Sequence, residues 1–180
     1  MRQRKIMYVR SDEKLSLARE IEKVKNKMIF SSYSLSIGEI VNLYESSELN
    51  IRAEFSHKYP WNDYKKTKFI ESILLDIPTP PIYVAASESG LWHVIDGQQR
   101  LLTILQFMQK LKHEDEKLSK PLVLQETRLL PSLKTVAWDN DKLFPVEKKM
   151  EFKRKKMLFH IIKASAKDIE YDIYRRLNFV

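Results

Sequence analysis

The chain has 180 residues, which suits one domain of ordinary size or one domain with an arm. It contains no cysteine, and this excludes disulfides, thiolate zinc sites, iron–sulfur clusters and cysteine nucleophiles. Its formal net charge of +8 indicates either a polyanionic partner, such as nucleic acid or a nucleotide, or simply a basic soluble protein.

The sequence also argues against a membrane protein and a transition-metal site. No apolar run approaches the roughly 18 residues of a membrane-spanning helix. The basic start at residues 1–5 leads into no apolar signal-peptide core. The four histidines are scattered without metal-ligand spacing. We therefore expect a cytoplasmic protein with no membrane partner.

Residues 12–29 have the pattern of an amphipathic helix. Leu17, Ile21, Val24 and Met28 fall on one stripe, and charged side chains occupy the rest. We predict a helical arm over residues 1–30 and a folded domain over residues 31–180. The arm packs either on that domain or on a second copy, so a homo-oligomer is one expectation.

Two further helices are predicted next. Ser36, with Glu39 three residues later, forms a capping box for a helix over residues 36–44. Residues 49–51 form a short strand candidate. Asn62 caps a helix from about residue 63 to 75. Glu71 in that helix pairs with Arg100, acts as a base on water, or is a plain surface glutamate, and the last is favoured.

A β-hairpin and a fourth helix are predicted after the prolines at 78, 80 and 81. Residues 82–85 and 91–95 are strand candidates, and Ser87 to Gly90 is the turn between them. The second strand runs into Asp96 and Gly97, and a helix follows at once. Its apolar face carries Leu101, Ile104, Leu105 and Met108.

The C-terminal third carries weaker patterns. We expect strands at 122–124 and 157–162, and helices at 146–156 and 166–177. The first of these helices is strongly basic. It forms either a nucleic-acid surface or an exposed helix face through Lys148, Lys149, Lys153, Arg154, Lys155 and Lys156.

The strand–turn–helix at residues 95–100 is the best candidate site. The first N–H groups of a helix lack internal partners and lie at the positive end of its dipole, so they bind anions. Gly97 would let a phosphate approach the backbone, and Arg100 could fork onto its oxygens. Gln98 and Gln99 could donate to phosphate or sugar, or orient water. Asp96 could accept from ribose, hold Mg²⁺ through water, or merely cap the helix.

Several segments resemble the N-terminal domain family of GmrSD-type restriction and phage-defence proteins. They are WHVIDGQQRLLT at residues 92–103, KYPW at 58–61, FIESILLDIPTPPIYV at 69–84 and DIYRRLN at 172–178. The resemblance spans roughly residues 33–178. It implies a ParB/sulfiredoxin-like fold whose strand–turn–helix binds a nucleoside triphosphate with Mg²⁺ and supports its hydrolysis. Sulfiredoxin chemistry is excluded, because it needs a cysteine.

Two departures from the family pattern affect the site. Lys58 stands where the family usually has arginine, and it keeps the charge without the planar fork. Lys58 and Tyr59 remain candidates for holding phosphate and stacking a base, or they belong to the surface and core. The family also continues beyond residue 180 into another helix, so we expect a trimmed fragment or a short form.

These observations together predict one α/β (α+β) domain with a small mixed sheet surrounded by helices. The favoured function is a nucleotide-binding, NTP-hydrolysing domain of a bacterial restriction or defence system. Candidate catalytic residues are Asp96, Gln98, Gln99 and Arg100. The alternatives are a non-catalytic DNA-binding module that grips backbone phosphates and a truncated inactive relative. No nuclease motif is visible, so DNA cleavage would need a nuclease partner or a further domain.

Overall fold

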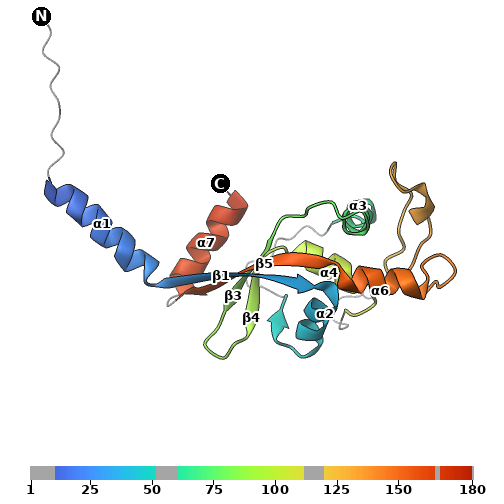
Figure 1. The fold of residues 1–180 in the computed structure, drawn as a ribbon, viewed down its shortest axis with the longest axis horizontal. Coiled ribbons are helices and arrows are strands. Elements are labelled where there is room, and N and C mark those ends of the chain that lie inside the picture. The colour runs from blue at the N-terminus through green and yellow to red at the C-terminus, as the bar shows by residue number, and fades with distance from the viewer. Residues whose placement is uncertain (1–10, 52–60, 112–119, 165–166, 180) are drawn as a thin grey trace, which may run out of the picture.

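The fold is described from a computed structural model, which covers residues 11–51, 61–111, 120–164 and 167–179 (Figure 1). In chain order its elements are α1 (Ser11–Lys25), β1 (Met28–Ser36), α2 (Ile37–Glu45), β2 (Leu49–Asn50), α3 (Asp63–Leu74), β3 (Ile82–Ala86), β4 (Trp92–Asp96), α4 (Gln98–Phe107), the 3₁₀ turn η1 (Pro131–Leu133), α6 (Val146–Arg154), β5 (Lys156–Ala164) and α7 (Lys167–Phe179). The predicted α/β class is confirmed.

The strands form one five-stranded mixed sheet in the order β1-β5-β3-β4-β2. β3 and β4 form the predicted antiparallel hairpin, and β3 lies parallel to β5. β1 pairs with β5 in an antiparallel ladder over all nine of its residues, from Met28 opposite Ala164 to Ser36 opposite Lys156. β1 and the two-residue β2 are therefore the sheet edges.

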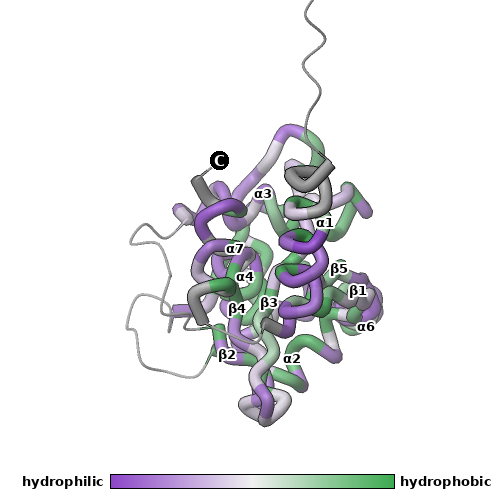
Figure 2. Tube along the Cα trace, turned by 90° about the vertical axis from the view of Figure 1, so that its left-hand side faces the viewer, coloured by the Kyte–Doolittle hydropathy of each residue, from purple (hydrophilic) through white to green (hydrophobic). Residues whose placement is uncertain are grey.

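The main core lies between one face of this sheet and helices α2, α3, α4 and α6. Strand side chains such as Ile82, Val84 and Phe159 are fully buried there against Ile70, Leu101 and Ile104. Beside α6, aromatic rings pack edge to face. The centroid of the Phe107 ring lies 5.5 Å from the ring centroids of both Trp138 and Phe144. Figure 2 shows hydrophobic residues concentrated in the strands and α4, whereas α1 is mainly hydrophilic.

The opposite face of the sheet is only partly covered. α7 crosses it, and Ile173 packs with Tyr83 against a small cluster of Ala85, Ile95 and Ile162 (Figure 1). The part of this face near β1 lies outside that cluster, and it carries polar side chains.

Local capping explains why the helices begin where the sequence predicted. The Ser36 hydroxyl accepts from the Glu39 N–H, and the Glu39 carboxylate accepts from the Ser36 N–H at 2.7 Å, which completes the capping box. The Ser36 hydroxyl also donates to Glu39 Oε2 at 2.6 Å, and this bond, together with the one from the Ser36 N–H, holds the pKa of Glu39 below its usual value. The Asn62 side chain accepts from the Lys65 N–H at 2.8 Å and starts α3.

Two predicted elements differ from the structure. The helix expected over residues 12–29 ends at Lys25, and residues from Met28 onward form β1. The helical stripe continued through Met28, but the long ladder with β5 determines the conformation of this segment. The strand expected at 122–124 is absent: Leu122 and Leu124 are buried, but this segment joins no strand of the sheet.

In the described parts of the chain, no helix is long and apolar enough to cross a membrane. The proposed boundary between an arm and a domain at residue 30 falls within β1 and stays a prediction.

Candidate functional site

The turn between β4 and α4 requires glycine at position 97. Gly97 is the N-cap of α4 and adopts a left-handed conformation, with φ 98°. A Cβ at this position would lie 2.3 Å from Ile82 Cδ1 and 3.2 Å from Arg100 Nη2. Backbone strain and lack of space both exclude a side chain there. Glycine at position 97 is therefore required by the backbone of this turn.

The guanidinium of Arg100 bonds to other groups of the protein. Its guanidinium donates through Nη1 to the carbonyls of Pro80 and Pro81, the second at 3.0 Å, and through Nη2 to Asp96 Oδ2 at 2.7 Å. Only 10% of this side chain is exposed. Burial lowers the pKa of Arg100, while the Asp96 carboxylate opposes that shift. Arg100 thus fastens the proline segment before β3 to the turn after β4.

The start of α4 presents, beside this clamp, backbone donors that have no backbone acceptor among the described residues. The N–H groups of Arg100 and Leu101 both reach the Gly97 carbonyl, at 3.1 Å. The amides of Gln98 and Gln99 precede them and have no partner within the helix. The carboxylate of Asp96 is one-third exposed beside them. The local geometry is that of an anion-binding helix start with an acceptor next to it.

The two glutamines differ in their contacts. Gln99 Oε1 accepts from the Trp61 N–H at 3.1 Å, so it ties the start of α3 to the turn. Gln98 is half-buried, and its side chain forms no hydrogen bond with the residues that the structure describes. Of the two glutamines, Gln98 is therefore the one whose side-chain amide is available to a ligand.

A polar row crosses the sheet and ends at the turn. Ser32 on β1 lies opposite His160 on β5, His160 opposite Tyr83 on β3, and Tyr83 opposite Asp96 on β4. Ser32 Oγ is 2.7 Å from His160 Nδ1, and the rings of His160 and Tyr83 have centroids 5.0 Å apart. Sequence reasoning missed this row, because its members come together only through strand pairing.

Several other predicted residues lie elsewhere or have partners. Lys58 and Tyr59 lie outside the described residues. Trp61, just after them, packs edge to face on Phe69 with ring centroids 5.7 Å apart. Lys66 is buried and pairs with Asp63.

The interpretation of Glu71 as a surface residue, or as a partner of Arg100, is wrong. Its side chain is 1% exposed, accepts from the Thr127 hydroxyl and pairs with Lys68. Burial alone would raise the pKa of Glu71. The hydrogen bonds from Lys68 and Thr127 outweigh that effect and hold its pKa below the usual value. Glu71 therefore anchors the 127–130 segment on α3.

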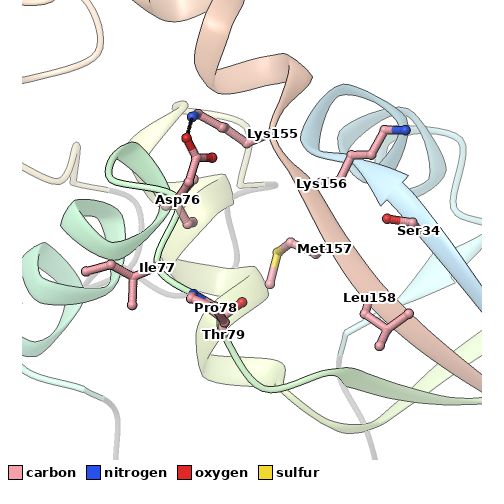
Figure 3. Close-up of a pocket in the computed structure, with 10 residues that line it drawn as sticks. Ser34, Asp76, Ile77, Pro78, Thr79, Lys155, Lys156, Met157 and Leu158 are labelled. Atoms are coloured by element: carbon pink, nitrogen blue, oxygen red, sulfur yellow. Dashed lines mark hydrogen bonds and ion pairs between the residues drawn. The ribbon is translucent and has the colours of Figure 1, made fainter.

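The basic residues predicted to lie on one helix over 146–156 do not form one continuous surface, because α6 ends at Arg154 and Lys156 begins β5. Lys148 pairs with Glu151 at 2.7 Å, and Lys149 pairs with Asp141 and is largely buried. Lys155 pairs with Asp76 beside a cavity of about 260 Å³ between β5 and the 76–79 loop, which Lys156 also lines; Figure 3 shows the Lys156 ammonium directed away from the Lys155–Asp76 pair. Among the six basic residues of the segment 148–156, those that are exposed and form no ion pair with the described residues are Lys153, Arg154 and Lys156.

The site offers one carboxylate to a metal ion. Among the described residues, no group of three or more histidine, aspartate or glutamate side chains gathers at one place. Asp96 has one carboxylate oxygen, Oδ2, bonded to Arg100.

Comparison with protein families gives a match over most of the chain. Residues 37–179 match the family described as GmrSD restriction endonuclease, N-terminal domain. The chain belongs to this family. The match contains α2 to α7 and both halves of the strand–turn–helix site. No curated protein and no solved structure matches the chain significantly.

Proposed function

We propose that this GmrSD N-terminal domain binds a nucleoside triphosphate at the turn from Asp96 to Arg100 and hydrolyses it within a bacterial restriction or phage-defence system. The observation that carries the proposal is the left-handed turn at Gly97, after which the backbone N–H groups of Gln98 and Gln99 have no acceptor within α4. The family name adds the restriction context.

Each residue of the turn then has a distinct role. The amides of Gln98 and Gln99 hold phosphate oxygens, and the Gln98 side chain contacts the terminal phosphate or orients water. Arg100 is a positioning residue, because its donors hold Pro80, Pro81 and Asp96. Its positive charge remains next to the bound phosphates.

Asp96 would hold Mg²⁺ through water, since Mg²⁺ at phosphate sites commonly uses one or two carboxylates besides phosphate oxygens. The ion would supply charge neutralisation for phosphoryl transfer. The protein's own contribution is to fix the phosphates and to present oriented donors where negative charge develops. Lys58 and Tyr59 remain proposed contacts for phosphate and base.

The test compares two glutamine-to-glutamate changes of equal charge. Calorimetric titration of each of the four NTPs with Mg²⁺ should show saturable binding to the wild type, with phosphate released. Gln98→Glu places a carboxylate against the phosphates and should weaken binding at least tenfold, while the helix start tolerates the acid. Gln125→Glu, on an exposed residue, should bind like the wild type.

Each outcome of this titration is informative. Binding without phosphate release would remove the hydrolase part of the proposal. If no NTP binds, or if both glutamate variants bind like the wild type, the site assignment is wrong.

The second candidate is a DNA-binding module, in which exposed Lys153, Arg154 and Lys156 contact backbone phosphates. This function predicts DNA affinity without nucleotide and a steep fall of that affinity with salt. Replacing these three residues by glutamine should flatten the slope of log K against log salt by about 2–3. An unchanged slope would exclude this surface. Any DNA cleavage would come from a nuclease partner or a further domain.

A further inference from the structure

In the described part of the chain, no strand pairs with the outer edge of β1. Its nine residues, Met28–Ser36, include no charged residue, no proline and no glycine. Ile29, Phe30 and Tyr33 are 64%, 60% and 52% exposed. Sheet proteins normally guard long edges with charges, proline, bulges or a covering segment, because free edge N–H and C=O groups pair with other strands. Such an edge indicates a binding surface.

The ladder with β5 determines which β1 groups face outward. The Ile37 N–H donates to the Lys155 carbonyl at 2.9 Å, so odd-numbered residues of β1 exchange hydrogen bonds with β5. The even-numbered residues Phe30, Ser32 and Ser34 therefore direct their N–H and C=O groups to the free edge. This edge can form a second antiparallel ladder without disturbing the first.

We propose that β1 pairs antiparallel with β1 of a second copy of this chain, about a two-fold axis at Ser31. Two copies with a net charge of +8 each repel one another over most of their surfaces, and β1 is a neutral segment where they can approach. This register sets Ile29 opposite the partner's Tyr33, and Tyr33 opposite the partner's Ile29. Both are non-hydrogen-bonded pairs, in which side chains lie closest.

This pairing also limits assembly to a dimer. A two-fold contact uses the same strand of both copies and leaves neither β1 edge free. The opposite edge of the sheet is β2, which has two residues, Leu49–Asn50, and offers little for continued pairing. The dimer would contain one continuous sheet built from both copies.

The exposed stripe of α1 is consistent with the same interface. Leu17, Ile21 and Val24 are 59%, 43% and 49% exposed, and α1 directly precedes β1 (Figure 1). Antiparallel pairing sets Met28, at the start of β1, opposite the partner's Ser34. The end of each α1 therefore lies beside the second copy, and the apolar stripe of α1 can pack on the surface of that copy.

Single cysteines test this register cleanly, because the chain has none of its own. Ser31→Cys would lie opposite itself at a Cα separation of about 4.5 Å, within disulfide range. Mild oxidation should therefore link most of the full-length protein into dimers. Ser34→Cys is the matched control: its two copies would lie six residues apart along the strands, about 20 Å, and should not link.

Solution mass gives the second measurement. Light scattering after size exclusion should give twice 21.4 kDa for the wild type and 21.4 kDa for Ile29→Lys/Tyr33→Lys, with unchanged circular dichroism since both side chains are exposed. A monomeric wild type overturns the proposal. So does a dimer that survives the double lysine variant, or one in which Ser31→Cys links no better than Ser34→Cys.

Discussion

Replacement of Gly97 by alanine tests the geometry on which the site depends. The left-handed backbone costs alanine about 1–2 kcal/mol, and the contact of 2.3 Å with Ile82 Cδ1 adds about 1–3 kcal/mol of overpacking. We therefore expect Gly97→Ala to lower the free energy of unfolding by about 2–5 kcal/mol. For a chain of this size that is a fall in Tm of roughly 5–15 °C.

The other glycines supply matched controls for this experiment. Gly90 also has a positive φ, of 86°, but nothing lies within 4 Å of its added Cβ. Gly90→Ala should therefore show the backbone cost alone, about 1–2 kcal/mol. Gly38 lies in α2 with no contact closer than 3.6 Å, so Gly38→Ala should be neutral or stabilising by up to about 1 kcal/mol.

The assay is urea unfolding followed by tryptophan fluorescence, with thermal unfolding as a check. Ile82→Val removes the clashing Cδ1, so in the Gly97→Ala background it should restore part of the lost stability, with a coupling of about 0.5–3 kcal/mol. The reasoning would be refuted if Gly97→Ala destabilised the protein no more than Gly90→Ala, or if the two changes were simply additive.

Three further changes probe the contacts around the site. Glu71 has a lowered pKa in the folded protein, so its contribution is present above the unfolded pKa of about 4.3 and is lost as pH falls through the folded value. Urea titrations should show that the wild type and Glu71→Gln differ in free energy of unfolding by a constant amount from about pH 5 to 8. This difference should shrink below about pH 4, and a difference that stayed constant there would contradict the role given to the Glu71 carboxylate. Ser36→Ala removes one half of the capping box and should cost about 1 kcal/mol by the same assay, and an unchanged midpoint would show that the cap is dispensable. Arg100→Met leaves Asp96 without its partner and should lower the free energy of unfolding by about 2–4 kcal/mol. This is below the range for fully buried ion pairs, because the Asp96 carboxylate is one-third exposed. A loss of stability under about 1 kcal/mol would mean that the clamp is not structural.

Local patterns in the sequence predicted most helices and the hairpin. The caps at Ser36 and Asn62 and the turn at Gly97 depend on residues within a few positions of one another, so their hydrogen bonds can be anticipated from spacing. β1 could not be anticipated in this way. Val24 and Met28 continue a helical stripe, and the strand forms because of a partner about 130 residues later.

The same distinction applies to the site. The sequence located the strand–turn–helix, but the partners of Arg100 are prolyl carbonyls about 20 residues earlier, which no local pattern indicates. Burial of Glu71 depends on Thr127, 56 residues away. His160 lies beside Tyr83 only because of the strand register between β3 and β5. Long-range pairing decides which polar groups are used internally and which remain open to a ligand.

The most direct test of the central claim is an NMR titration of ¹⁵N-labelled protein with each Mg-NTP. Phosphate oxygens that accept from the helix start should give their largest, saturable shifts at the backbone amides of Gln98 and Gln99, and Gln98→Glu should abolish these shifts. If every nucleotide leaves those two amides unchanged while the protein stays folded, the turn after β4 is not a nucleotide site.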